Sequence, residues 1–230
     1  MFHAVIVAAG TGERLDSIVP KQYIPVLGKP LLAYTLYAFD RFSPIQDIVV
    51  VINPRHEKLF ASTVLGKYRF SKRLRVVHGG DSRQESVGKG IDALTCVENE
   101  FVFIHDGVRP FVDEDILNRC AKAVEIHNAV CCALPCVDTI KITRDGKTID
   151  HSLDRKVVWR AQTPQVFRVS LILEAFRKAI AEGYTATDDS SLVEWMGKPV
   201  YLVPGSEENF KITTAGDFLR AEELIRWKTT

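Results

Sequence analysis

The N-terminal segment Phe2–Ala8 (FHAVIVA) constrains the fold most, because it is a continuous apolar run. A strand with one face in water alternates apolar and polar residues, whereas a strand covered on both faces has an unbroken apolar sequence. A secretory signal peptide also has an apolar core, but a basic segment precedes that core, and this N-terminus lacks one. We therefore expect Phe2–Ala8 to be a buried strand of a sheet that helices cover on both faces.

Short β-branched runs then alternate with longer amphipathic stretches as far as residue 134. The apolar runs predict strands at Ile48–Ile52, Leu74–Val77, Phe101–Ile104 and Ala129–Leu134. Helices are expected at Leu31–Phe42, from Pro54, at Ser82–Leu94 and at Asp113–His127. Such βαβ repetition predicts an α/β, Rossmann-like fold with a mostly parallel sheet and helices on both of its faces.

The repetition changes after Ala129–Leu134. Thr139–Thr143 and Lys147–Ile149 flank Asp145-Gly146, a dipeptide that favours a type I′ hairpin turn. We expect one domain over residues 1–230, from which a β-arm projects at about 138–156. The remaining elements are predicted as a strand near Val157–Trp159, helices near Val169–Glu182 and Asp188–Met196, a strand at Val200–Val203 and a last helix from Thr214, with Thr214 and Asp217 as a capping box.

The composition is that of an ordinary globular protein, with 46% apolar and 26% charged residues and a net charge of +1. No overall basic field points to nucleic acid, and no apolar stretch reaches the roughly 20 residues of a membrane span. The five cysteines (Cys96, Cys120, Cys131, Cys132 and Cys136) have no CxxC or zinc-ligand spacing. We expect them to be core thiols of a protein in the reducing cytoplasm.

Three polar clusters, Gly10–Arg14, Gly79–Ser86 and His105–Arg109, each begin where a predicted strand ends. Ligands of parallel sheets bind beyond the carboxyl ends of the strands, so the clusters are expected to converge on one crevice. The Gly10–Arg14 loop is suited to bind phosphate through its backbone N–H groups, although a plain tight turn is an alternative. The dinucleotide fingerprint would need a third glycine near Leu15 and an acidic residue near Asn53, and neither is present.

Several side chains of these clusters suit phosphate chemistry. Arg14 and Lys21 are placed to stabilise charge on a triphosphate, unless both are solvated surface cations. Asp106 is expected at the carboxyl edge of the sheet, where it would be a natural Mg²⁺ ligand or a residue that forms a turn. Ser86 is placed to contact a base or ribose, whereas Asp81 and Ser82 also fit as helix caps, and His105 fits best as an orienting group.

Seven motifs in order resemble the 2-C-methyl-D-erythritol 4-phosphate cytidylyltransferase family of the non-mevalonate isoprenoid pathway. The resemblance runs nearly end to end, and the order makes it specific although each motif alone is weak. The motifs are Ala8–Arg14, Pro20-Lys21-Gln22, Gly79–Val87, His105–Pro110, Gln162–Phe167, Thr187-Asp188-Asp189 and Asn209–Thr213.

The resemblance implies cytidylyl transfer from CTP to methylerythritol phosphate, a divalent cation such as Mg²⁺, and a homodimer whose β-arms embrace. By the same resemblance Arg14 and Lys21 stabilise the transition state, and Asp106 is the carboxylate associated with the metal. Arg155 and Lys211 belong with the catalytic residues, with Arg155 acting in the partner's site. The CTP pocket is implied to contain Ala8, Ala9, Gly10, Gly12, Gly80, Asp81 and Ser86, and the acceptor phosphate to contact Arg109, Thr139, Arg155, Thr163 and Lys211.

Three alternatives stay open from the sequence. Ribitol-5-phosphate cytidylyltransferases have similar motifs, but their first loop usually begins Ala-Gly-Gly where this chain has Ala8-Ala9-Gly10. A nicotinamide-dependent dehydrogenase is disfavoured by the incomplete fingerprint. An inactive nucleotide-binding module is disfavoured because every cation that the transfer needs is present.

Overall fold

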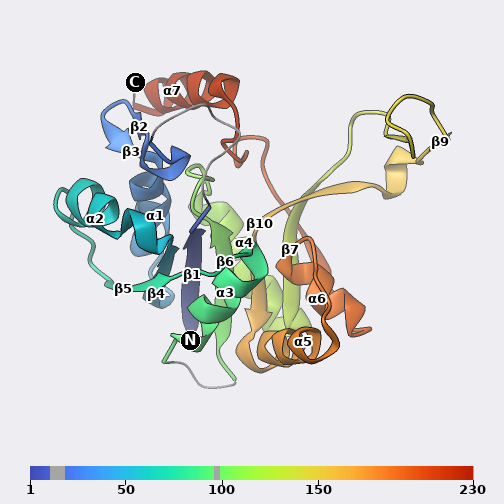
Figure 1. Ribbon diagram of the computed structural model, residues 1–230, viewed down its shortest axis with the longest axis horizontal. Coiled ribbons are helices and arrows are strands. Elements are labelled where there is room, and N and C mark those ends of the chain that lie inside the picture. Colours follow the sequence, from blue (N-terminus) through green and yellow to red (C-terminus); the bar gives the residue numbers. More distant parts are fainter. Residues whose placement is uncertain (11–18, 96–98, 230) are drawn as a thin grey trace.

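A computed structural model describes residues 1–10, 19–95 and 99–229 of the chain. Its main sheet has seven strands in the order β11-β7-β10-β6-β1-β4-β5 (Figure 1). All neighbouring pairs are parallel except those of β10, which is antiparallel to both β6 and β7. The strands are β1 (Phe2–Ala8), β4 (Ile45–Ile52), β5 (Arg73–His78), β6 (Phe101–Asp106), β7 (Ala129–Pro135), β10 (Trp159–Arg168) and β11 (Tyr201–Pro204). The predicted α/β class with a mostly parallel sheet is confirmed.

Helices cover both faces of the sheet, as the apolar sequence of β1 predicts. Ala4 and Ile6 point into an apolar layer under α1, α2 and α4, whereas Val5 points into a second layer under α3, α5 and α6. The helices of the first layer are α1 (Leu31–Arg41), α2 (Glu57–Phe60) and α4 (Glu114–His127). Those of the second are α3 (Arg83–Asp92), α5 (Val169–Glu182) and α6 (Asp189–Trp195).

Short elements lie between these strands and helices. They are η1 (Lys21–Tyr23), β2 (Pro25–Val26), β3 (Lys29–Pro30), η2 (Pro54–His56), η3 (Ala61–Leu65) and η4 (Arg155–Val157). The C-terminal helix is α7 (Ala215–Thr229). The predicted capping box of α7 is confirmed, because Asp217 N donates to Thr214 Oγ1 and the Asp217 carboxylate accepts from Thr214 N. In the described part of the chain, no helix has both the length and the apolar character of a membrane span.

The segment between β7 and β10 projects from the sheet as an arm (Figure 1). Its strands are β8 (Lys141–Ile142) and β9 (His151–Ser152), and Ile142 pairs with His151. The predicted strand Thr139–Thr143 contains β8, but the predicted strand Lys147–Ile149 and the type I′ turn are wrong, because β9 begins at His151. Asp145 Oδ1 instead accepts from the backbone N–H groups of Lys147 and Thr148, so its side chain organises a longer loop.

The strand predicted near Val157–Trp159 is also wrong, because β10 runs from Trp159 to Arg168. The polar residues and Pro164 in its middle hide the strand in the sequence. The structure accommodates them with a register shift against β7 between Ala161 and Gln165 and a cis peptide bond before Pro164. Cys120, Cys131, Cys132 and Cys136 are free and buried, which confirms the prediction of core thiols for these four, while Cys96 lies outside the described residues.

Candidate functional site

A cleft of about 450 Å³ opens at the carboxyl ends of β1 and β6. This volume lies within the range of small-molecule sites. The three clusters predicted to converge all contribute to it, although Gly12 and Arg14 lie outside the described residues. The described lining residues are Val7, Ala8, Ala9, Gly10, Lys21, Gln22, Asp81, Ser82, Arg83, Ser86, Asp106, Val108 and Lys211.

Gln22 fixes the end of β1 where the glycine-containing loop begins. Its amide Nε2 donates to the carbonyls of Ala8, at 2.8 Å, and Gly10, at 2.9 Å. The side chain is 1% exposed, so these bonds form away from competing water. Gln22 directly follows Lys21, and the same bonds therefore help to hold η1 and its lysine against the cleft. No periodicity in the sequence reveals this role.

The turn after β5 requires Gly79. A Cβ atom at this position would lie 2.6 Å from Ala9 Cβ and 2.7 Å from Ser86 Oγ, so only glycine allows β1 and α3 to approach this closely. The backbone N–H of Gly80 donates to Ser86 Oγ at 3.0 Å. Ser82 caps α3 by accepting from Glu85 N, which confirms the capping alternative for this residue. Asp81 and Ser82 both line the cleft.

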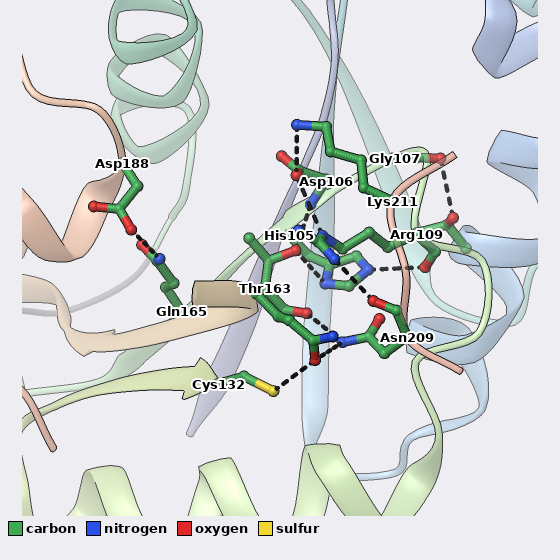
Figure 2. A network of polar contacts seen from close by, with 12 residues as sticks. His105, Asp106, Gly107, Arg109, Cys132, Thr163, Gln165, Asp188, Asn209 and Lys211 are labelled. Carbon is green, nitrogen blue, oxygen red and sulfur yellow. Dashed lines mark hydrogen bonds and ion pairs between the residues drawn. The ribbon is translucent and has the colours of Figure 1, made fainter. Parts of the chain in front are cut away.

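Asp106 is buried at the end of β6 and is surrounded by cations (Figure 2). Lys211 Nζ lies 2.9 Å from Oδ2, Arg109 Nε lies 3.5 Å from the same oxygen, and Arg83 Nε lies 3.5 Å from Oδ1. Burial alone would raise the pKa of this carboxyl, but the charges of the three cations hold it well below its ordinary value. Asp106 is therefore ionised at neutral pH.

His105 and Thr163 hold the backbone of Asp106 in place through a short chain of hydrogen bonds. Thr163 Oγ1 accepts from the backbone N–H of Asp106 at 3.1 Å and lies 3.0 Å from His105 Nδ1. Burial lowers the pKa of His105 to about 4, so its ring is neutral. Its Nε2 lies 3.0 Å from the carbonyl of Arg109 and must carry the proton, because a carbonyl can only accept. The Thr163 hydroxyl then donates to His105 Nδ1. Both of these hydrogen bonds of the Thr163 hydroxyl are therefore made within the protein.

Asn209 fixes the segment that carries Lys211 over the cleft. Its side-chain Nδ2 donates to the backbone carbonyl of Thr163 at 2.8 Å. The backbone carbonyl of Asn209 accepts from Arg109 Nη1 at 2.8 Å (Figure 2). Arg109 thus ties Asp106 to this segment, and it is not among the side chains that line the cleft. The sequence singled out Arg109, Thr163 and Lys211 as contacts. It included Asn209 in the Asn209–Thr213 motif but assigned no role to it.

Arg83 is a cleft residue to which the sequence assigned no role. Its guanidinium Nη2 lies 2.7 Å from Asp189 Oδ2, and its Nε faces Asp106. It belongs to the quoted Gly79–Val87 motif and Asp189 to the Thr187-Asp188-Asp189 motif, but the spacing of these motifs does not reveal that they meet. The two residues meet because the first residues of α3 and α6 lie next to each other.

Thr139 and Arg155 are exposed residues of the arm, between β7 and β10. Arg155 Nη1 donates to the carbonyl of Val137, within the arm itself. Neither residue lines the cleft of its own chain.

The donor set of the cleft fits a hard divalent cation that also binds phosphates. The described residues contain no group of three histidines, cysteines or carboxylates that would hold a metal alone. Mg²⁺ commonly uses only one or two carboxylates and takes its other ligands from substrate phosphates and water. Asp106, ionised at the cleft, meets this requirement, with Asp81 on the same lining.

The family model of 2-C-methyl-D-erythritol 4-phosphate cytidylyltransferase matches residues 2–227. The chain is 42% identical over 223 residues to the protein of that name from Caldanaerobacter subterraneus subsp. tengcongensis, which covers 97% of this chain and 98% of the relative. It is 43% identical over 226 residues to the protein of the same name from Syntrophus aciditrophicus, and the match covers 97% of this chain and 95% of that relative.

Solved structures show the same similarity. The 4-diphosphocytidyl-2C-methyl-D-erythritol synthase of Anaerococcus prevotii superposes with a TM-score of 0.85 at 34% identity, over 98% of this chain and 96% of that one. The 2-C-methyl-D-erythritol 4-phosphate cytidylyltransferase of Thermus thermophilus superposes with a TM-score of 0.78 at 31% identity, over 98% and 100%. The similarity therefore includes both the sheet and the segments around the cleft.

Proposed function

Because the chain belongs to the 2-C-methyl-D-erythritol 4-phosphate cytidylyltransferase family, it transfers the cytidylyl group of CTP to methylerythritol phosphate, and we propose that it does so in the cleft beside Asp106. The observation that carries this location is the cluster of Arg83, Arg109 and Lys211 around one buried carboxylate at the end of β6. The products are 4-diphosphocytidyl-2-C-methyl-D-erythritol and pyrophosphate, and the reaction belongs to isoprenoid precursor synthesis.

The chemistry needs charge and positioning rather than a general base. An oxygen of the acceptor phosphate forms a bond to the α-phosphorus of CTP, while the bond from that phosphorus to pyrophosphate breaks on the opposite side. The attacking phosphate is already an anion, so no proton has to be removed from it. Two anions must approach, and fixed cations lower the repulsion between them. This requirement matches the cations of the cleft.

The proposed roles divide the cleft into two parts. Arg14 and Lys21 stabilise charge on the triphosphate as it develops, and Lys211 with the partner's Arg155 positions the acceptor phosphate. Arg109 and Thr163 support this second part through their bonds to Asp106 and its neighbours. Thr139 of the arm completes the acceptor contacts. The CTP pocket comprises Ala8, Ala9, Gly10, Gly12, Gly80, Asp81 and Ser86.

Mg²⁺, or another divalent cation, is proposed to bind Asp106 together with the phosphates of CTP. When bound, it neutralises phosphate charge and supports the departure of pyrophosphate. The protein is further proposed to work in the cytoplasm, as one domain over residues 1–230 and as a homodimer joined through the arm at about 138–156. The exposed apolar side chains of the arm support the dimer, since Val137, Ile149 and Val157 are more than half exposed in the single chain.

Purified protein with CTP, Mg²⁺ and methylerythritol phosphate is expected to release pyrophosphate, and to release much less with ATP in place of CTP. Ribitol phosphate is the decisive alternative acceptor, because the two families have similar motifs. The assay follows pyrophosphate with each acceptor at equal concentration. A folded enzyme that prefers ribitol phosphate would contradict the acceptor assignment.

Asp106→Asn is expected to raise the Mg²⁺ concentration at half-maximal activity by about tenfold or more, the scale on which metal sites respond to the loss of ligand partners. The variant is expected to retain its circular dichroism spectrum, because Asp106 is the last residue of β6 and lines the cleft. Titration of pyrophosphate release with Mg²⁺ measures the shift. An unchanged titration would assign the metal to another carboxylate, and Asp81→Asn would then be tested in the same way.

A further inference from the structure

Arg83 connects the start of α3 to two buried carboxylates that belong to different parts of the chain. Its Nη2 lies 2.7 Å from Oδ2 of Asp189, the first residue of α6, whereas its Nε lies 3.5 Å from Oδ1 of Asp106. The first distance is that of a strong charge-assisted hydrogen bond, and the second is that of a looser ion pair. The single guanidinium is therefore shared unequally between the two anions.

Burial makes this sharing important. Asp189 is 1% exposed, and a buried carboxylate without a partner is costly, so it needs the arginine. Burial would lower the pKa of Arg83, but the neighbouring charges of Asp189 and Asp106 raise it well above its ordinary value. Arg83 is therefore a permanent cation at the wall of the cleft, and the position of Asp189 decides which way it points.

Asp189 is itself held in place from two other elements. Gln165 of β10 donates from Nε2 to Asp188 Oδ2 at 2.7 Å (Figure 2) and accepts from Ser190 N at 2.9 Å, on either side of Asp189. Gln84, the neighbour of Arg83, bonds the backbone of Tyr184 and Ala186 just before α6. These contacts keep α6 beside α3 and prevent Asp189 from following Arg83 toward the cleft.

The two carboxylate oxygens of Asp106 therefore have different ion pairs. Oδ2 receives Lys211 at 2.9 Å and Arg109 at 3.5 Å, whereas the ion pair of Oδ1 with the described residues is the 3.5 Å contact to Arg83. Without Asp189, Asp106 would be the carboxylate that remains in an ion pair with Arg83 among the described residues. The Arg83 guanidinium would then move closer to Asp106 Oδ1 and compete with any cation that binds to this oxygen.

We infer that Asp189 is a positioning residue that draws the Arg83 guanidinium away from Asp106, and so keeps Asp106 Oδ1 available to a divalent cation bound with CTP. The inference rests on the proposed metal role of Asp106 and adds two residues to that site. Asp189 touches neither the substrate nor the metal, and acts only through Arg83. Its charge rather than its shape is the essential property, because a neutral amide does not hold a guanidinium as a carboxylate does.

The test measures Mn²⁺ binding in the presence of CTP and without an acceptor, so that no turnover occurs. Free Mn²⁺ is followed by electron paramagnetic resonance. Asp189→Asn is expected to weaken Mn²⁺ binding by about tenfold, as outer-shell changes at metal sites commonly do. The double variant R83M/D189N is expected to bind Mn²⁺ within about threefold of wild type, because the competing cation is gone. A purely structural role of Asp189 predicts no such recovery.

Asp113→Asn is the matched control, because Asp113 caps α4 by accepting from Ile116 N and does not line the cleft, and the carboxylates whose charges act on Arg83 are Asp189, Asp106 and Asp188. It is expected to lower the melting temperature and to leave Mn²⁺ affinity unchanged. Should Asp189→Asn fail to fold, the double variant alone decides, since it removes both buried charges together. The inference is overturned if Asp189→Asn binds Mn²⁺ as wild type does, or if the double variant binds at least tenfold more weakly than wild type.

Failure of the proposed function gives a different pattern. If Asp106 holds no metal, Asp106→Asn binds Mn²⁺ with CTP as tightly as wild type does. If the cleft is not the transfer site, Mn²⁺ binding responds to Asp189→Asn but pyrophosphate release does not respond to Lys21→Ala.

Discussion

Lys21→Ala is expected to lower kcat for pyrophosphate release by about 10²–10³-fold, the scale of losing one preorganised donor to a charge that develops in the transition state. The affinity for CTP is expected to change only a few-fold, because the proposed interaction strengthens as pyrophosphate leaves. Lys21 begins η1, which is held at the cleft by the neighbouring Gln22. Steady-state kinetics with saturating methylerythritol phosphate separate kcat from KM, and calorimetry with CTP alone measures binding.

Lys58→Ala provides the control for the loss of one lysine charge, because Lys58 is exposed on α2 and does not line the cleft. Its kinetic constants are expected to equal those of wild type. Arg14→Ala is expected to behave as Lys21→Ala does, from the family resemblance alone. A Lys21→Ala enzyme with a raised KM for CTP and an unchanged kcat would show that Lys21 binds the ground state and has no special role in the transition state.

Subunit exchange between inactive variants is expected to restore about a quarter of wild-type activity. Arg155→Ala and Lys21→Ala homodimers are each expected to be nearly inactive, because every site lacks one of the two cations. Random exchange makes half of the dimers mixed, and each mixed dimer has one intact site of two if Arg155 acts in the partner's cleft. The structure is consistent with this arrangement, since Arg155 lies on the arm and does not line its own cleft. Activity is measured after exchange has been verified by native mass spectrometry.

Lys21→Ala mixed with Lys211→Ala is the matched negative control. Both lysines line the cleft of one chain, so every site of every mixed dimer keeps a defect and no activity is expected to return. If the Arg155→Ala and Lys21→Ala mixture also shows no recovery after verified exchange, the two residues serve the same chain and the shared site is wrong.

The sequence predicted the central part of the fold well, because buried parallel strands leave a strong signal. The run at β1 and the runs at β4, β6 and β7 are apolar on both sides, and each was located within a few residues of its observed bounds. β10 was missed because its ladder includes polar residues and Pro164, whose burial depends on partners from other parts of the chain. The arm turn was wrong because the Asp145 side chain accepts from the backbone N–H groups of Lys147 and Thr148, which the dipeptide rule does not consider.

The site was predictable where a residue ends a strand, as Ala8 and Asp106 do. It was not predictable where a long-range partner gives a residue its role. Gln22 acquires its role from the carbonyls of Ala8, at the end of β1, and of Gly10 beyond it, and Arg83 acquires its role from a carboxylate more than a hundred residues away. Such pairings depend on the packing of helices, which periodicity within one helix does not specify.

The reversed direction of β10 allows the length of the arm to vary without moving the strands of the sheet. β7 and β10 are antiparallel neighbours, paired from Pro135 with Trp159 at the root of the arm, so the chain leaves the sheet and returns at the same edge. The arm is the tip of one long hairpin, and a parallel return would have needed a crossover across the sheet. Extra residues at such a tip cost only a slowly growing loop entropy. The arm can therefore change in length while the residues that hold Asp106 keep their geometry.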